Sequence, residues 1–236
     1  GTRCALEHGG VAPVIVSHDA DMDDTVALLA KAGFYHAGQV CVSVQRVYAE
    51  KSIARSLAEK IAEAGTNMKI GDPTSDDTEI GPLIRHAEAD RVEEWVQDAV
   101  DKGAELISGG KKISDSCYQA TVLFNPPADA VISQNEIFGP VICVYEYEDI
   151  DQAIRQANSL DVAFQAAVFS KNIDTCMYAF RQLDASAVMV NDHTAFRVDW
   201  MPFAGLKHSG HGVGGIPHTF RDMQIDKMMV IRSPSL

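Results

Sequence analysis

The chain alternates short apolar runs with amphipathic stretches along most of its 236 residues, and this alternation constrains the fold more than any other feature. Short apolar runs between turn residues are typical of buried strands, whereas apolar residues every three or four positions are typical of helices. We predict strands at 14–16, 43–49, 141–145, 166–169 and 187–190, with further short strands bracketed by Gly109-Gly110 and Pro126-Pro127. We predict helices at about 25–36, 52–64, 86–102, 150–159 and 173–183. Strands separated by helices imply parallel crossovers, so the predicted class is α/β, a mostly parallel sheet flanked by helices.

Polar and glycine-rich segments mark the ends of this pattern. The acidic run 19–24 is expected to cap the first helix, and Ser52 is the expected cap of the second. The pattern stops at 202–215, a glycine-rich loop. Beyond that loop, 227–232 is an apolar run without an adjacent hairpin partner. Two interpretations stay open: this run pairs with the sheet edge of another chain, or it returns to its own sheet.

Composition narrows the possible partners. The chain has 20 basic and 33 acidic side chains and a net charge of −13, which disfavours a nucleic-acid partner because phosphate binding needs a basic surface. No apolar run approaches the ~20 residues that span a bilayer, so we expect no membrane span. The five cysteines include no CxxC pair, which favours a reducing cytoplasm over a disulfide framework. Because the chain opens without Met and quickly reaches a buried strand, we expect an N-terminal portion to be missing.

Cys41 is the cysteine with unusual neighbours. It follows Ala37-Gly38-Gln39-Val40 in the turn between a predicted helix and a predicted strand. Gly38 lets the backbone bend there, and such a turn can present the sulfur to a cleft. The thiolate would be the nucleophile, favoured by a nearby positive charge or by backbone N–H groups. A buried structural cysteine is the alternative and more frequent role.

Two carboxylates stand in comparable positions. Glu7 precedes Gly9-Gly10 at the mouth of the first strand, where partial burial could raise its pKa and make it a general base. Glu136 lies in a loop before a strongly apolar strand, where it could accept ribose hydroxyls, with Phe138 offering a flat face to an aromatic ring. The alternatives are a solvated edge glutamate for Glu7 and a turn with an anchoring phenylalanine for Phe138.

Taken together, these segments resemble the aldehyde dehydrogenase superfamily. Residues 6–10, Leu-Glu-His-Gly-Gly, are similar to its glutamate motif, and residues 34–41, Phe-Tyr-His-Ala-Gly-Gln-Val-Cys, to its nucleophile motif. Residues 135–141, 190–191 and 201–210 follow in the family's order. The resemblance covers essentially the whole chain and lacks the family's upstream, cofactor-binding half. The chain departs from the usual motifs at five positions, with His8 in place of leucine, Val11 of lysine, His36 of asparagine, Ala204 of glycine and Gly214 of glutamate.

The resemblance implies a catalytic domain over 1–221 and an oligomerisation tail over 222–236. It implies NAD or NADP as cofactor, an aldehyde as substrate, and a homodimer or homotetramer. Cys41 would be the nucleophile, Glu7 the base that activates water on a thioester, Glu136 the ligand of the nicotinamide ribose, and Phe138 a neighbour of the nicotinamide. Gly38, Gln39, Asn191 and Phe203 would shape the site. Because relatives that acylate coenzyme A lack the glutamate, Glu7 favours a free carboxylic acid as product. The fragment alone is expected to be inactive.

Other functions stay open from the residues alone. A thiol hydrolase could use Cys41 with His36 or His8, although no hydrolase signature is present. A non-catalytic module could assemble through 227–233. A metal site at His208, His211 and His218 is disfavoured, because the glycine-rich loop gives no fixed ligand spacing. Arg197 could pair with an anionic aldehyde, although an ordinary surface arginine is the more frequent role.

Overall fold

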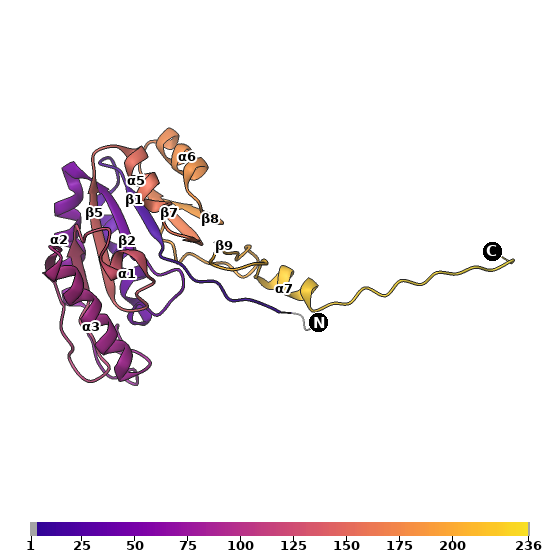
Figure 1. Cartoon of the computed structure of the whole chain (residues 1–236), viewed down its shortest axis with the longest axis horizontal. Helices are drawn as coiled ribbons and strands as arrows, with labels where there is room; N and C mark the ends of the chain where they lie inside the picture. The colour runs from indigo at the N-terminus through magenta and orange to yellow at the C-terminus, as the bar shows by residue number, and fades with distance from the viewer. Residues whose placement is uncertain (1–3, 236) are drawn as a thin grey trace.

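A seven-stranded sheet forms the centre of the molecule in the computed structural model, which describes residues 4–235 (Figure 1). The sheet order is β3-β4-β5-β2-β1-β7-β8. Every neighbouring pair is parallel except β3–β4, an antiparallel pair at one edge. The predicted class, a mostly parallel α/β sheet flanked by helices, is confirmed. The strands are β1 (Pro13–Val16), β2 (Arg46–Glu50), β3 (Glu105–Ser108), β4 (Thr121–Phe124), β5 (Val141–Tyr147), β7 (Gln165–Phe169) and β8 (Ala187–Val190).

Helices cover both faces of the sheet and divide the core in two. On one face lie α1, α2 and α3, whose apolar stripes pack with alternate strand residues such as Val14 and Val47. On the other face, α5 and α6 pack against the intervening residues such as Ile15 and Tyr48. Because successive strand side chains point to opposite faces, both faces of the central strands are apolar. The helices are α1 (Met22–Phe34), α2 (Lys51–Asn67), α3 (His86–Asp101), α4 (Val131–Gln134), α5 (Ile150–Ala157), α6 (Ile173–Gln182) and α7 (Ile216–Asp222).

Two predicted boundaries move for identifiable reasons. α1 begins at Met22, before the predicted residue 25, because the side chain of Asp21 accepts a hydrogen bond from the Asp24 N–H at 3.3 Å. α2 begins at Lys51 after Glu50, and no side-chain hydrogen bond caps it, so the prediction of Ser52 as the cap is wrong. The spacing of the apolar stripe on α2 is confirmed by Leu57 and Ile61, both fully buried.

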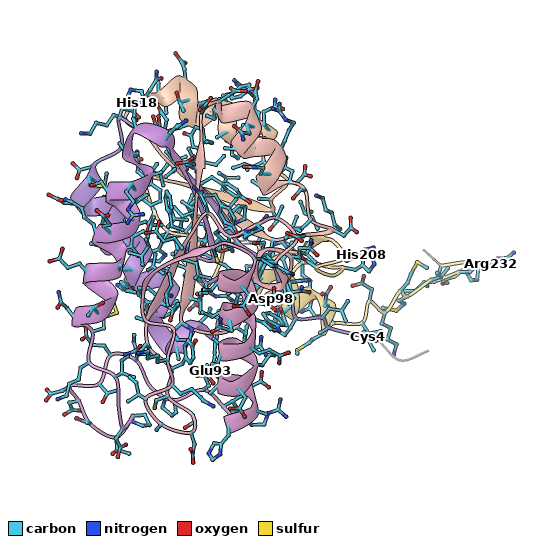
Figure 2. All side chains as sticks on the ribbon, turned by 60° about the vertical axis from the view of Figure 1, so that its left-hand side comes forward. Cys4, His18, Glu93, Asp98, His208 and Arg232 are labelled. Atoms are coloured by element: carbon cyan, nitrogen blue, oxygen red, sulfur yellow. The ribbon has the colours of Figure 1, made fainter. Side chains whose placement is uncertain are left out.

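The glycine-rich loop contains regular structure that the sequence pattern did not predict. β9 (Leu206–Lys207) pairs antiparallel with β6 (Val162–Ala163), and α7 follows. After α7 the chain extends away from the body, and 224–233 belongs to no helix or strand (Figure 1). The expectation that 227–232 forms a strand in its own sheet is therefore wrong; the alternative pairing with another chain stays a prediction. Figure 2 shows Arg232 in this extended segment.

The described helices include none that is both long and apolar enough to cross a bilayer.

The parallel strands of the sheet place the loops before them at one common edge, the edge where the strands begin. Parallel strands begin at the same edge, so the loops that precede β1, β2 and β5 lie there together. In the sheet order, β2 lies between β5 and β1. Glu136 precedes β5, Cys41 precedes β2 and Glu7 precedes β1, so the topology places the cysteine between the two carboxylates.

Candidate active site

Cys41 stands on a short turn between α1 and β2. The Ser43 N–H donates to the Val40 carbonyl at 2.9 Å, which closes the turn over Cys41. The turn is held onto the end of α1, because the Ser43 hydroxyl and the Val44 N–H both donate to the Ala32 carbonyl, at 3.0 and 3.3 Å. These bonds replace strand pairing, and they explain why β2 begins at Arg46 although alternation predicted a strand from 43. Cys41 is half-buried.

Gly38 joins the cysteine turn to the loop that carries Glu136. Its backbone has φ +71°, in the left-handed region that favours glycine. A methyl group built on Gly38 would overlap the carbonyl group of Gly139, so the two loop backbones are in direct contact. The reason for a glycine here is therefore twofold: a positive φ and a close approach. The role of Gly38 in shaping the site stays a prediction.

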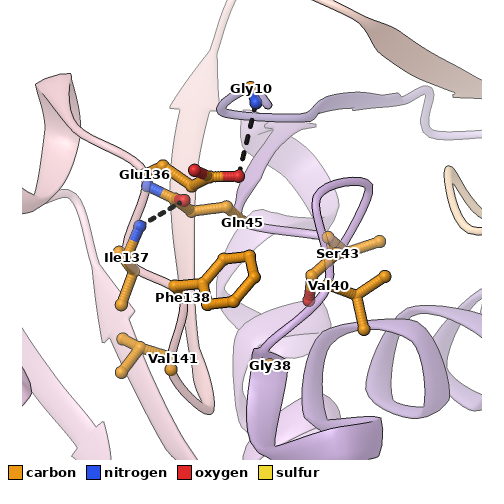
Figure 3. A pocket seen from close by; sticks show the side chains of 11 residues that line it. Gly10, Gly38, Val40, Ser43, Gln45, Glu136, Ile137, Phe138 and Val141 are labelled. Atoms are coloured by element: carbon orange, nitrogen blue, oxygen red, sulfur yellow. Dashed lines mark hydrogen bonds between the residues drawn. The ribbon is translucent and has the colours of Figure 1, made fainter. Parts of the chain in front are cut away.

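Gly10 binds the side chain of Glu136, and Gln45 binds the backbone on either side of it (Figure 3). Its Oε1 accepts a hydrogen bond from the Gly10 N–H at 3.4 Å, which brings the loop before β1 to the loop before β5. Gln45 holds the backbone around it: its amide donates to the carbonyls of Ile132 and Asn135 at 3.1 and 2.7 Å and accepts from the Ile137 N–H at 3.0 Å. Burial raises the pKa of Glu136, an effect that the Gly10 N–H and Arg91 partly offset.

Phe138 borders a hollow beside Glu136. The residue has φ +49° and is 41% exposed, so its ring is presented rather than buried (Figure 3). The hollow, with about 220 Å³ of empty space that includes open solvent, lies between the cysteine turn and the Glu136 loop. Its lining includes Gly10, Gly38, Val40, Ser43, Glu136 and Phe138.

Glu7 and His8 enter the site from the loop before β1. Glu7 is exposed. His8, the position where the resemblance implies leucine, is only 4% exposed and packs its ring against Phe164 and Phe203. Its buried Nδ1 has no hydrogen-bond partner within residues 4–235. The imidazole thus occupies an apolar position, as the implied leucine would.

The segment after β8 returns to the same edge. The buried Thr194 hydroxyl donates to the Val42 carbonyl at 2.6 Å, which fastens this segment to the cysteine turn. Phe203 packs edge-on against Phe164 at 4.6 Å between ring centroids, and exchanges two backbone hydrogen bonds with Gly214. Phe203 therefore lies beside the loop of Glu7, and its role in shaping the site stays a prediction.

Gln39 and Asn191 are bound into the framework. The Gln39 amide donates to the carbonyls of His36 and Pro82 and accepts from the Ile84 N–H at 2.8 Å. Asn191 follows β8 at the opposite, carboxyl edge of the sheet, where its amide exchanges two hydrogen bonds with the Ser170 backbone. The structure thus brings Cys41, Glu136, Phe138 and Phe203 to one edge but leaves Asn191 at the other.

The thiol of Cys41 is a weaker acid than an ordinary cysteine. Burial raises its pKa, and the negative charges of Glu136 and Glu7 raise it further. The Cys41 backbone N–H and Arg197 act in the opposite direction, as the sequence analysis expected of positive groups, but they do not prevail. The surroundings of Cys41 in this chain therefore favour the thiol over the thiolate.

We expect Glu136→Gln to speed alkylation of Cys41 by iodoacetamide at pH 7. Because only the thiolate reacts, removing the nearest carboxylate charge lowers the pKa of the thiol and increases its reactive fraction. The alkylation rate is measured as a function of pH. In the wild type, the pH at half-maximal rate should be higher than in a model cysteine peptide. In the variant, this pH should move toward the value of the peptide. Glu93→Gln, a carboxylate of α3, is the matched control and should leave the profile unchanged.

Two alternative sites find little support in the described residues. No imidazole makes a hydrogen bond to the Cys41 thiol, so neither His36 nor His8 is placed as the base of a cysteine hydrolase within residues 4–235. Across that same part of the chain, no group of three or more His, Cys, Asp or Glu side chains could hold a metal ion.

Three important residues were missed by sequence reasoning. Gln45 and Thr194 hold the loops of the site, and Arg46 is 3% exposed and donates to carbonyls of the segment before β1 and of the end of α5. Arg46 carries the only available signal, since a charged residue at the start of an apolar strand must find partners when buried. The buried amide of Gln45 and the buried hydroxyl of Thr194 could not be predicted in this way, because uncharged polar residues are common in both buried and exposed positions.

Comparison with known proteins finds aldehyde dehydrogenases among the relatives of this chain. The 3-sulfolactaldehyde dehydrogenase of Priestia megaterium is 37% identical over 229 residues, which are 97% of this chain and 48% of that protein. The lactaldehyde dehydrogenase of Methanococcus aeolicus is 34% identical over 231 residues, 98% of this chain and 49% of its own length. The chain therefore spans about half the length of these curated relatives.

Solved structures give the same result. The glyceraldehyde-3-phosphate dehydrogenase of Methanocaldococcus jannaschii, complexed with NADP, superposes with a TM-score of 0.88 at 35% identity, over 92% of this chain and 47% of that one. Aldehyde dehydrogenase 21 of Physcomitrella patens, in complex with the reaction product succinate, gives 0.87 at 36% identity, over 91% and 45%. The model of the aldehyde dehydrogenase family matches residues 1–229, and the chain therefore belongs to that family.

Proposed function

We propose that this chain supplies the nucleophile and the base for the NAD(P)-dependent oxidation of an aldehyde to a carboxylic acid. The observation that carries the proposal is the placement of Cys41 between the loops of Glu7 and Glu136 at one edge of the sheet. Since the chain spans about half of its relatives, the activity belongs to a protein in which a cofactor-binding half is also present.

The chemistry begins at the Cys41 sulfur. Once its proton is lost, the thiolate attacks the aldehyde carbon and forms a thiohemiacetal, whose oxyanion the Cys41 backbone N–H can stabilise. NAD(P), which Glu136 and Phe138 would hold, would supply the hydride acceptor that the oxidation of this carbon to a thioester requires. Glu7 then removes a proton from water, the water oxygen attacks the thioester carbon, and the carbon–sulfur bond breaks to release the acid and the thiolate. Because Glu7 is exposed, water can reach it directly.

The residues around the hollow fit one end of such a cofactor. Glu136 presents a carboxylate, an acceptor for ribose hydroxyls, and one of its oxygens is already oriented by the Gly10 N–H. Phe138 stands exposed beside it with a flat apolar face. The raised pKa of Glu136 shows that its charge is poorly solvated here, so a hydroxyl donor would stabilise it.

The two half-reactions are tested separately. Thioester hydrolysis needs no cofactor, so the chain alone is incubated with p-nitrophenyl acetate at pH 8.5 and followed by mass spectrometry. We expect slow turnover in the wild type and none in Cys41→Ala. Glu7→Gln should accumulate an acetyl group on Cys41 because deacylation fails. Cys117→Ala, a half-buried cysteine outside the site, is the matched control and should behave as the wild type.

The oxidation is tested in a fusion that places this chain behind the preceding half of the Priestia megaterium relative. NADH or NADPH should form from aldehydes and disappear in Cys41→Ala. A folded fusion that turns over the ester but oxidises no aldehyde would contradict the proposal and favour a cysteine hydrolase.

We also propose that the segment 222–236 is an assembly tail and that the protein is a cytoplasmic homo-oligomer. Two observations support this. Met228, Met229 and Val230 are each about four-fifths exposed, and no strand within the described chain pairs with them. Free thiols without disulfides among residues 4–235 are consistent with a reducing compartment.

A further inference from the structure

Arg197 is held beside the site by packing instead of by an ion pair. Its guanidinium carbon lies 4.4 Å from the ring centroid of Phe203, a stacking distance. Phe203 is itself fixed against Phe164 and His8, and His8 adjoins the base Glu7. One face of the guanidinium is therefore covered by a ring that is itself packed on two others, while the side chain as a whole is exposed.

The same segment is fastened to the cysteine turn. Thr194, three residues before Arg197, is fully buried and donates to the Val42 carbonyl at 2.6 Å. As a result, the Arg197 charge lies close enough to Cys41 to lower the pKa of its thiol. From the segment after β8, the positive charge of Arg197 therefore acts on the sulfur against the negative charges of Glu7 and Glu136.

Arg197 also has no acidic partner. No Asp or Glu within residues 4–235 forms an ion pair with it, although the chain has 33 acidic side chains against 20 basic ones. Among the other exposed arginines, Arg55 and Arg85 pair with glutamates, whereas Arg181 within the described residues does not, so it is the position of Arg197 beside the site that distinguishes it. The unpaired N–H edge of Arg197 is a fork that matches a carboxylate, sulfonate or phosphate.

We propose that Arg197 determines specificity for aldehydes that carry a small anionic group, by binding that group while the carbonyl carbon faces Cys41. This inference rests on the proposed aldehyde oxidation for its biological meaning. Two carboxylates near the sulfur repel an anionic substrate, so a chain with Glu7 and Glu136 requires a compensating cation to accept one. Arg197 is the cation in that position.

The test compares two reagents of similar size that alkylate the same thiolate, neutral iodoacetamide and anionic iodoacetate. Their ratio of rates at Cys41 reports the binding of an anion near the sulfur and cancels any change in the pKa of the thiol. In Arg197→Met and Arg197→Gln, we expect the ratio of iodoacetate to iodoacetamide to fall about fivefold. Arg197→Lys, which keeps the charge, should lie between these variants and the wild type.

Controls separate a local effect from a general one. Arg181→Met removes an exposed arginine of α6 and should leave the ratio at Cys41 unchanged. The ratio at Cys117 in the same samples should not change in any variant. An unchanged ratio at Cys41 in Arg197→Met, or equal slowing by both reagents, would overturn the proposal, because Arg197 would then act only on packing or on the thiol pKa.

The outcome is independent of the proposed oxidation. Alkylation requires neither cofactor nor turnover, so it is measured on this chain as it stands. Failure of the fusion to form NADH or NADPH would refute the oxidation while the ratio still reported an anion site. If the fusion oxidises aldehydes but the ratio at Cys41 is the same in the wild type and the Arg197 variants, only the anion site is refuted.

Discussion

Replacement of Gly38 by alanine is expected to lower the free energy of unfolding by about 4 kcal/mol or more, a size that is exceptional for one methyl group. Alanine at φ +71° costs about 1 kcal/mol of backbone strain. The larger part comes from the overlap with the Gly139 carbonyl, which is backbone and cannot rotate away. Urea denaturation followed by circular dichroism would measure the change.

Gly212→Ala is the matched control for this prediction. Gly212 has φ +84°, but a methyl group there would meet nothing within 4 Å. We expect a loss of about 1 kcal/mol, from the backbone strain alone. Equal losses in the two variants would show that the approach of Gly38 to Gly139 is not needed for stability. If Gly38→Ala separates the two loops instead of unfolding the chain, the pKa of Cys41 should fall, because Glu136 moves away with its loop.

Replacement of Arg46 by methionine is expected to destabilise the chain by about 3 kcal/mol, because each unsatisfied buried acceptor costs about 1–3 kcal/mol. Arg46 donates twice to the Val11 carbonyl, at 3.1 and 2.9 Å, and to the carbonyls of Gln156 and Ala157 at 3.2 and 3.0 Å. Methionine fills the same space without these donors. The variant should also loosen the loop that carries Glu7, which precedes Val11.

Arg55→Met provides the comparison for Arg46. Arg55 is exposed and pairs with Glu59 and Glu105, so its loss should change the stability far less than the loss of Arg46. Both variants are measured by urea denaturation at the same pH. A loss no larger for Arg46 than for Arg55 would mean that water reaches the carbonyls of Gln156 and Ala157 and replaces the guanidinium.

The regular elements follow closely from local pattern wherever that pattern is long. β8 occupies 187–190 as predicted, and α3 begins at His86 as predicted and ends at Asp101, one residue early. Errors occur where tertiary contacts override alternation. Residues 43–45 alternate like a strand, yet Val44 bonds to the end of α1 and Gln45 turns its amide to the Glu136 loop.

The candidate site was predicted unevenly for a physical reason. Cys41, Glu136 and Phe138 stand in motifs with glycine or proline beside them, and such residues mark turns that present side chains. Gln39 stands beside Gly38 in a similar motif, but its amide bonds to the backbone of Pro82 and Ile84, and the amide of Asn191 bonds to the backbone of Ser170. Local sequence cannot distinguish an amide that faces a cleft from one that closes a turn. The role of Glu7 as the base stays a prediction of the family resemblance.

The sheet order has a consequence for synthesis on the ribosome. β2 pairs with β5, made much later, and β1 pairs with β7, made later still. Contacts between distant segments form slowly, so the nascent chain carries Cys41 before its surroundings exist. During that interval the thiol has neither the burial nor the Glu136 charge that raise its pKa in the folded chain. Folding therefore lowers the thiolate fraction of Cys41, and that fraction is higher in the newly synthesised chain until β5 docks.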